Sequence, residues 1–224
     1  MSKGKLIVIE GADGSGKATQ TKLLVDHLVE ENISYFTIDF PQYENNIFGG
    51  FIKECLKGEH GDFVGFDPYI ASIPYACDRF ESKSKIVDAL ERGETVIMDR
   101  YVSANQIHQG GKIKDAEARE KYLKWIDKVE HEVFGLPRPD LIIYLDVPYS
   151  IVKKLVQERI AKEGGARDLV EENAEYLINS QKAALAIVMQ KGSWTKVSCA
   201  DGEAMMSREA IHEKIWEKVK EIVK

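Results

Sequence analysis

The sequence has few cysteines and no long apolar run. Its three cysteines, Cys55, Cys77 and Cys199, lie far apart, and their odd count and wide spacing argue against a disulfide framework or a zinc site. We therefore expect a reduced, cytoplasmic protein whose cysteines fill the core. The apolar run "LIVI" at residues 6–9 is far too short for a signal peptide or a membrane span, so no membrane contact is expected.

An excess of positive charge is also missing. The formal net charge is −6, with 44% hydrophobic and 30% charged residues, the composition of an ordinary soluble globule. Binding of nucleic acid through a broad, positively charged surface is therefore not expected. A small phosphorylated ligand is compatible with this charge, because it needs only a local cluster of cations. The length of 224 residues suits a single domain, 1–224.

Short apolar runs alternate with longer helical patterns along the chain. The runs are nearly continuous in hydrophobic residues and predict strands buried on both faces, at 5–10, 34–39, 95–99, 140–146 and 195–199. Helices are predicted at 17–31, 68–92, 115–133, 148–162, 170–190 and 207–223. This alternation predicts an α/β, three-layer fold with a parallel five-stranded sheet flanked by helices. The polar, glycine-bearing stretch near 159–170 predicts a surface loop or, in a sharper interpretation, a short mobile lid.

The stretch "GADGSGKAT" at 11–19 carries the strongest chemical signal. It follows a predicted strand and opens a predicted helix, the setting in which G-x-x-x-x-G-K binds nucleotide phosphates rather than forming a chance turn. Backbone N–H groups and the positive end of the helix would face phosphate oxygens, with Lys17 as the mobile charge. The predicted ATP-binding residues are Gly11, Ala12, Asp13, Gly14, Ser15, Gly16, Lys17, Ala18 and Thr19.

Ala18 stands where this motif normally carries a hydroxyl that binds Mg²⁺. Thr19 is not an automatic substitute, because successive helical residues point about 100° apart. Since Mg²⁺ takes most ligands from water and substrate phosphates, we expect it to accompany ATP and to contact Asp99 through water. The alternative is a nucleotide-binding regulator that has lost catalysis.

Five landmarks along the chain resemble those of thymidylate kinases, bacterial-type members most of all. They are "IEGADGSGK" (9–17), "FPQY" (40–43), "YACDRF" (75–80), "DRYVSANQIHQ" (99–109) and "LPRPDLIIYLDVP" (136–148), followed by a basic lid, "ERIAKEGGARD" (158–168). The resemblance covers nearly the whole chain. It implies a P-loop nucleoside monophosphate kinase that transfers the γ-phosphate of ATP to dTMP for dTTP synthesis. It also implies a homodimer, with Mg²⁺ as cofactor.

The resemblance further implies an acceptor site. The residues implied to bind dTMP are Asp13, Phe40, Pro41, Tyr75, Arg79, Arg100, Asn105 and His108. Tyr75 and Arg79 share one face of a predicted helix and suit stacking on, and hydrogen bonding to, a pyrimidine. The alternatives are structural: a core tyrosine with an outward arginine, and for Arg100 a surface ion pair in place of a phosphate contact.

Other positions have two interpretations each. Asp13 is implied to bind the acceptor's 3′-hydroxyl, and a turn-forming aspartate is the alternative. For His108, where some relatives have tyrosine, the choice lies between rejection of a 2′-hydroxyl and an ordinary surface or core histidine. Gln42 stands where relatives carry an arginine that touches the acceptor phosphate. The segment 198–204 is expected near the adenine.

The predicted catalytic residues are Lys17, Arg100, Arg159 and Arg167. The phosphate loop itself holds no arginine, so the two lid arginines would supply charge in the transition state, unless the lid is simply a solvated charged loop. An acceptor phosphate, with a second pKa of about 6, needs no general base. A kinase for another deoxynucleotide or deoxynucleoside stays open. A GTPase switch would need an N-K-x-D segment, which the sequence lacks.

Overall fold

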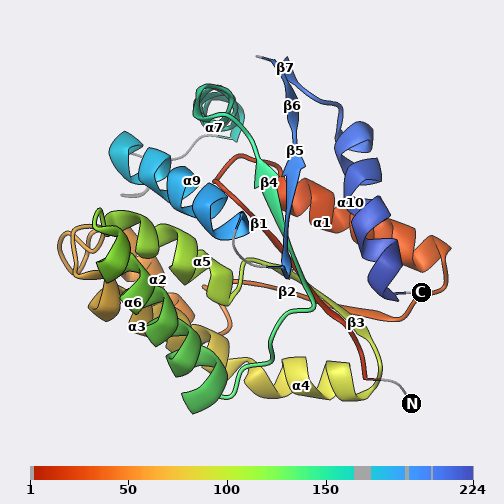
Figure 1. The fold of residues 1–224 in the computed structure, drawn as a ribbon, viewed down its shortest axis with the longest axis horizontal. Coiled ribbons are helices and arrows are strands. Elements are labelled where there is room, and N and C mark those ends of the chain that lie inside the picture. Colours follow the sequence, from red (N-terminus) through yellow and green to blue (C-terminus); the bar gives the residue numbers. More distant parts are fainter. Residues whose placement is uncertain (1–2, 164–172, 190–191, 203, 224) are drawn as a thin grey trace.

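A five-stranded parallel sheet lies between two layers of helices in this computed structural model, which describes residues 3–163, 173–189, 192–202 and 204–223 (Figure 1). The strands are β1 (Leu6–Gly11), β2 (Tyr35–Asp39), β3 (Thr95–Asp99), β4 (Leu141–Asp146) and β5 (Trp194–Ser198). Their order in the sheet is β2-β3-β1-β4-β5, and every neighbouring pair is parallel. The predicted α/β fold class and all five strands are confirmed.

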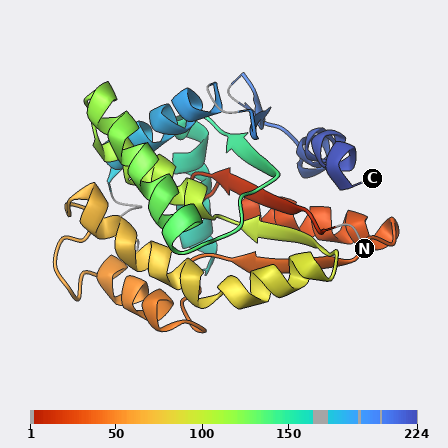
Figure 2. The ribbon, with the colours of Figure 1, turned by 60° about the horizontal axis from the view of Figure 1, so that its bottom comes forward.

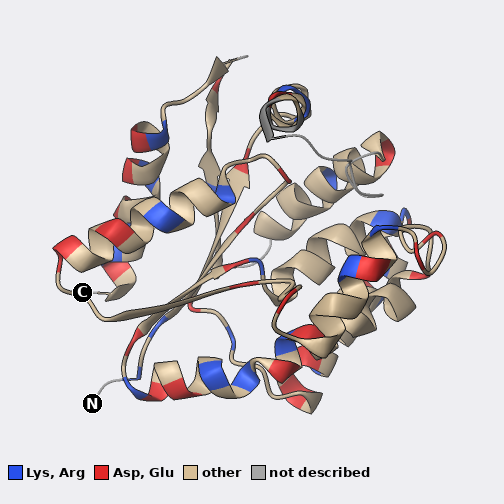
Figure 3. Cartoon of the chain, turned by 180° about the vertical axis from the view of Figure 1, so that it is seen from behind, with Lys and Arg blue, Asp and Glu red and all other residues tan. Residues whose placement is uncertain are grey.

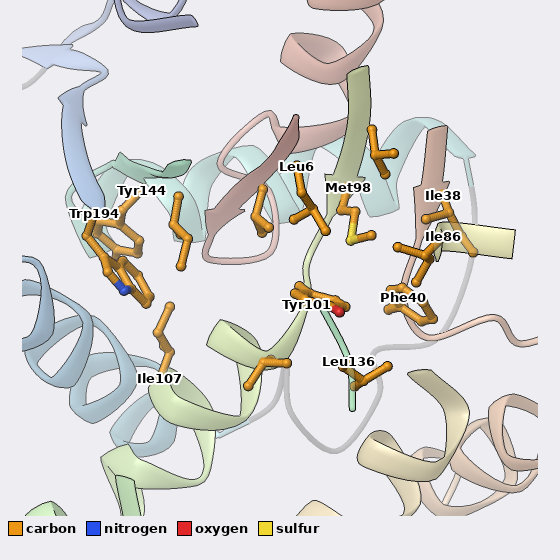
Figure 4. Packing of buried hydrophobic residues seen from close by; sticks show 14 of the residues in the cluster. Leu6, Ile38, Phe40, Ile86, Met98, Tyr101, Ile107, Leu136, Tyr144 and Trp194 are labelled. Atoms are coloured by element: carbon orange, nitrogen blue, oxygen red, sulfur yellow. The ribbon is translucent and has the colours of Figure 1, made fainter. Parts of the chain in front are cut away.

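Successive side chains of each central strand point to opposite faces of the sheet and pack against the two layers of helices. On one face, Ile7 and Ile9 join an apolar cluster with α1 (Lys17–Glu30), α7 (Tyr149–Glu163) and α10 (Arg208–Val223). On the other face, Leu6 and Val8 pack with α4 (Lys83–Glu91), α5 (Val102–His108) and α9 (Ala174–Val188). This second cluster extends from Trp194 and Tyr144 at one end to Phe40 and Ile38 at the other, with Tyr101 between them (Figure 4).

Burial on both faces was predicted for every strand, and this is wrong for the sheet edges. In β2 the side chains of Tyr35, Thr37 and Asp39 are exposed, because β2 pairs only with β3. The central strands β1 and β3 follow the prediction, and all six residues of β1 are buried. The two edge segments, 34–39 and 195–199, are in fact more polar than the central ones, and this was a usable signal that the prediction did not apply.

The single helix predicted over 68–92 is two helices, α3 (Pro68–Glu81) and α4. Its start is confirmed, since Asp67 accepts a hydrogen bond from the backbone N–H of Tyr69 at 2.9 Å. The break falls at Ser82, where Asn46 Nδ2 donates to Ser82 Oγ at 2.9 Å and to the backbone oxygen of Asp78 at 2.8 Å. These tertiary contacts compete with the regular helical bonds, and the helical periodicity of the sequence does not reveal them.

The helix predicted over 115–133 also changes character. α6 covers Ala116–Asp127, and the chain continues as a π-helical segment, η2 (Lys128–Val133), which turns Glu130 into the interior. Several short elements were not predicted at all: α2 (Ile47–Leu56), α5, η1 (Gly110–Lys112), β6 (Ala200–Asp201) and β7 (Ala204–Met205). Of these, α2 lies beside α3 at the edge of the molecule away from α1 and α10 (Figure 2).

The charged residues of the surface and the three cysteines also bear on the predictions from the sequence. Acidic and basic residues are interspersed along the helices (Figure 3). Cys55 and Cys199 are buried as predicted, but Cys77 is half-buried, and all three are free thiols. Among the helices of the described residues, none reaches the length and apolar content required to cross a membrane.

We predict that Asn46→Ala destabilises the fold by about 1–3 kcal/mol, because it leaves the buried Asp78 carboxylate with one donor fewer and frees the α3–α4 break. Urea denaturation measures the change. Asn45→Ala is the control, since Asn45 is exposed and, among the described residues, its side chain bonds Gln42 Oε1 alone. Equal losses of stability in the two variants would contradict this role for Asn46.

Candidate active site

The polar residues of the site gather where the parallel strands end. Two adjoining hollows lie there, and we call them the loop cleft, of about 700 Å³, and the inner cavity, of about 120 Å³. Both are lined by the same five residues, Asp13, Phe40, Pro41, Tyr43 and Arg100. The carboxyl ends of strands in an open parallel sheet are the usual place for a ligand site, and here two such sites share a border.

The phosphate loop joins β1 to α1 and lines the loop cleft. Gly14 and Gly16 have φ of +80° and +91°, the left-handed region that favours glycine. A Cβ on Gly14 would also lie 2.8 Å from Val156 Cγ2, so a larger residue would displace α7. Residues 13–20 line the cleft, and the predicted place of the loop between a strand and a helix is confirmed.

Lys17 is buried under the loop. Its ammonium donates to the backbone oxygens of Gly11 and Ala12, each at 3.1 Å, and lies 3.6 Å from Asp13 Oδ1. Burial and then the charge of Arg100 lower the pKa of Lys17, while the carboxylates of Asp13 and Asp99 oppose that change. The lysine is therefore held at the cleft by two backbone carbonyl oxygens and by the charge of Asp13, and a phosphate can replace the two carbonyl oxygens.

Asp13 and Arg100 form an ion pair at the border of the two hollows. Burial alone would raise the pKa of Asp13, but the charges of Arg100 and Lys17 outweigh it and hold that pKa far below its usual range. Arg100 has φ of +68°, a conformation a non-glycine residue adopts at a cost, and its N–H donates to the oxygen of Ile9 at 3.0 Å. The pair lies between the two hollows, and its side chains are partly buried, with 18% of Arg100 and 29% of Asp13 exposed.

The loop cleft also holds oxygen ligands of the kind that Mg²⁺ prefers. Asp99 and Asp39 are directly paired on neighbouring strands, and both line this cleft with Ala18 and Thr19. Burial raises the pKa of Asp99, and the charges of Lys17 and then Arg100 oppose that rise. Among the described residues, no group of three or more His, Cys, Asp or Glu side chains could hold a metal. A cation here would depend on other ligands.

The inner cavity collects the predicted acceptor residues Phe40, Tyr75, Arg79 and Asn105. Arg79 is 2% exposed, so the interpretation as an outward arginine is wrong. Its Nε and Nη2 donate to the two carboxylate oxygens of Glu130, at 2.6 and 2.8 Å. Tyr75 lines the same cavity, and the centroid of its ring lies 5.9 Å from that of Phe63.

His108 also lines the inner cavity, so it is not a surface residue. Its ring stacks on Tyr176 with centroids 5.9 Å apart and planes 7° apart. Both ring nitrogens are buried and lack a hydrogen-bond partner within the described part of the chain. Burial and then the charge of Arg100 lower the pKa of His108 to about 3, so the imidazole is neutral at physiological pH.

The structure describes the side chain of Gln42, which stands in place of an expected arginine, but not the side chains of the two lid arginines. Gln42 Nε2 donates to Asp39, to the backbone oxygen at 2.7 Å and to Oδ1 at 2.6 Å, and Gln42 lines neither hollow. It therefore does not take over the role of the arginine it replaces. Arg167 lies outside the described residues, as does most of the expected lid, and Arg159 belongs to α7 but its side chain is not described.

Several residues of the site were missed from the sequence. Glu10, inside β1, is fully buried and accepts from Ser103 Oγ at 2.6 Å and from the N–H of Tyr101 at 3.2 Å. Burial raises its pKa. The sequence could have revealed Glu10, because it is a charged residue within an otherwise apolar strand. Glu130 and Tyr176 carried no such signal, and neither did the residues that line the far end of the loop cleft, Leu155 and 205–208.

We predict that acid weakens the fold partly through His108. In the unfolded chain His108 binds a proton below the ordinary histidine pKa of about 6.5, whereas in the folded chain it stays neutral down to about pH 3. The free energy of unfolding therefore falls as pH falls through this range. Between pH 7.5 and pH 5 the protein should lose about 1–2 kcal/mol more than its His108→Gln variant. Denaturant midpoints at both pH values measure this, and parallel losses in the two proteins would count against it.

Comparison with known proteins agrees with this geometry. Residues 9–219 match the thymidylate kinase family. Thymidylate kinase of Mycobacterium tuberculosis, in strains CDC 1551 / Oshkosh and ATCC 25618 / H37Rv, is 32% identical over 171 residues, which cover 76% of this chain and 79% of that protein. The thymidylate kinase of Schizosaccharomyces pombe is 34% identical over 146 residues, covering 65% of this chain and 62% of that protein.

A solved structure of thymidylate kinase from Candida albicans has the same fold. Its TM-score is 0.72 at 24% identity, and the match covers 99% of this chain and 93% of that chain. The family match over most of the sequence, the two neighbouring hollows and the phosphate loop at their border agree with one another. This chain therefore belongs to the thymidylate kinase family.

Proposed function

We propose that this protein transfers the γ-phosphate of ATP to dTMP, giving ADP and dTDP, and that residues 1–224 act as one catalytic domain. The observation that carries the proposal is the shared border of the two hollows, where Asp13 and Arg100 line both the loop cleft and the inner cavity. Transfer between two phosphorylated ligands needs them end to end over fixed cations, with little covalent help from the protein.

ATP would occupy the loop cleft. Its β- and γ-phosphates would lie against the loop N–H groups, and Lys17 would exchange its carbonyl partners for phosphate oxygens. The adenine would extend toward residues 205–208, which line the far end of the cleft and follow the expected 198–204 segment. Arg159 and Arg167 remain the proposed source of charge from the lid, because the loop holds no arginine.

dTMP would occupy the inner cavity. Phe40, Pro41 and Tyr75 offer flat apolar contacts to the base, while Arg79 donates to a base carbonyl and Asn105 supplies a second polar contact. Arg100 would hold the acceptor phosphate and Asp13 the 3′-hydroxyl, each giving up part of its present ion pair. The neutral His108 would face the sugar.

We also propose Mg²⁺ as the partner of ATP. The residues fit the ion in part: Asp99 and Asp39 present oxygen ligands, and the remaining ligands would come from phosphates and water. Bound there, the ion would neutralise charge on the transferred phosphate. Ala18 weakens such a site without removing it. A regulator without catalysis is not favoured, because Lys17, Asp99 and Arg100 all line the loop cleft.

The proposed setting is the reducing cytoplasm, which suits three free thiols. The proposed assembly is a homodimer. Exposed large apolar side chains gather on the neighbouring helices α2 and α3, namely Ile47, Phe48, Phe51, Ile70, Ile73 and Phe80. The three on α3 are three and seven apart and share one helical face. An apolar patch of this kind on a soluble protein is typical of an interface.

Phosphorylation of dTMP is tested with an ADP-release assay over a panel of acceptors, with and without Mg²⁺. We predict that dTMP is the preferred acceptor and that Lys17→Met lowers kcat at least about a hundredfold, since it removes the charge facing the β- and γ-phosphates. Lys22→Met is the control, because Lys22 is an exposed lysine of the same helix, paired only with Asp26. A preference for a nucleoside over dTMP would refute the proposed function.

The dimer is tested by the molar mass in solution. We predict a dimer for the native chain at tens of micromolar and a monomer for Ile73→Glu, because a carboxylate cannot be buried unpaired in an apolar interface. Val29→Glu is the matched control, since Val29 is 54% exposed on α1, on the opposite side of the sheet. Light scattering after gel filtration gives the mass, and a monomeric native chain would exclude this interface.

A further inference from the structure

Glu130 lies behind the inner cavity and bonds two of the residues that line it. We propose that Glu130 is a positioning residue that fixes which base edge the cavity accepts, and so selects thymine over cytosine. The inference rests on the proposed function, because it takes the inner cavity as the acceptor site. It differs from that function in concerning a carboxylate that does not line the cavity.

The position of Glu130 depends on the π-helical segment. The side chain is fully buried, although the residue follows an exposed, charged helix, and the wider turn of η2 directs it inward. Such π-helical turns occur frequently at functional sites. Its carboxylate accepts three hydrogen bonds from two residues, two from Arg79 and one from Asn105 Nδ2 at 3.0 Å. A carboxylate is the only side chain that accepts this many bonds without donating one.

Arg79 is oriented by the two-bond contact. The bonds to Glu130 use Nε and Nη2, at 2.6 and 2.8 Å. No hydrogen bond between described residues uses Nη1, although Arg79 lines the cavity. The guanidinium is planar, so fixing one edge fixes the direction of the remaining N–H groups. Arg79 therefore presents a donor of fixed direction to the acceptor base.

Asn105 is oriented by the third bond. Its Nδ2 donates to Glu130 Oε1 at 3.0 Å and to the backbone oxygen of Ser72 at 3.2 Å, which uses both amide hydrogens. The rest of the residue is held as well, since Tyr122 Oη donates to the backbone oxygen of Asn105 at 3.1 Å. With Nδ2 committed, Oδ1 is left as the acceptor on a residue that lines the cavity.

A fixed donor beside a fixed acceptor matches one pyrimidine edge and not the other. Thymine offers the O4 oxygen as acceptor and the neighbouring N3–H as donor, whereas cytosine offers an N4 amino donor and an N3 acceptor. Cytosine would therefore set donor against donor and acceptor against acceptor, and a buried site built for hydrogen bonds rejects such a ligand strongly. Arg79 cannot reverse its polarity. Asn105 could, by rotating its amide, and Glu130 prevents this.

The test is Glu130→Gln, assayed with dTMP and dCMP as acceptors. A glutamine keeps the size but has an NH2 group in place of one carboxylate oxygen, so it cannot accept all three bonds, and the Asn105 amide can turn. We expect KM for dTMP to rise at least about tenfold and the dTMP-to-dCMP ratio of kcat/KM to fall at least about tenfold. KM for ATP should stay within about twofold. The control is Glu132→Gln, on the exposed side of the same segment.

The outcomes separate the two proposals. If the native chain does not phosphorylate dTMP, the proposed function fails. If the native chain is active and Glu130→Gln keeps the native dTMP-to-dCMP ratio, the positioning role is overturned, even when overall activity drops. A merely structural glutamate would lower activity with both acceptors alike.

A second pair of variants covers misfolding, since Glu130→Gln leaves the buried Arg79 charge without its partner. Arg79→Gln and the double variant Arg79→Gln/Glu130→Gln remove that charge. We expect the double variant to lose discrimination against dCMP at least about fivefold beyond Arg79→Gln, because only there is Asn105 free to turn. Equal ratios in these two variants would overturn the role of Glu130.

Discussion

The ion pair between Arg100 and Asp13 is the contact on which the arrangement of the site depends. It joins the end of β3 to the phosphate loop after β1, which are neighbouring strands in the sheet. Because both strands are parallel, their carboxyl ends lie together and the two charges meet at one border. The strained backbone of Arg100 is held by the N–H bond to Ile9, so the arginine stays at the junction of both hollows.

Charged groups buried around this junction are individually costly, and several of them have specific partners. Glu10 holds the turn after β3 through Ser103 and the N–H of Tyr101, and Glu130 neutralises Arg79 behind the inner cavity. Such pairs add little net stability compared with apolar packing, but they fix the direction of polar atoms. The site combines an apolar wall, from Phe40 and its neighbours, with a few polar atoms of set orientation.

Two departures from the family pattern affect the two ligands differently. Ala18 concerns the donor side, where Asp99 and Asp39 still supply oxygen ligands at the strand ends. Gln42 concerns the acceptor side, where it bonds Asp39 and leaves the inner cavity with Arg79 and Arg100 as its arginines among the described residues. In the function proposed above, phosphate binding on the acceptor side would therefore fall mainly to Arg100, and the fixed position of this residue would matter more.

The sequence alone determined the α/β class, the five strands, the phosphate loop and most of the residues that meet at the two hollows. These follow from local chemistry: apolar runs, glycine spacing and charges at strand ends. The break at Ser82 and the inward turn of Glu130 needed the tertiary structure. Each depends on partners far away in the chain, such as Asn46 for Ser82 and Arg79 for Glu130. Local periodicity carries no information about such contacts, because a helix of the same pattern can stay regular or bend, depending on what packs against it.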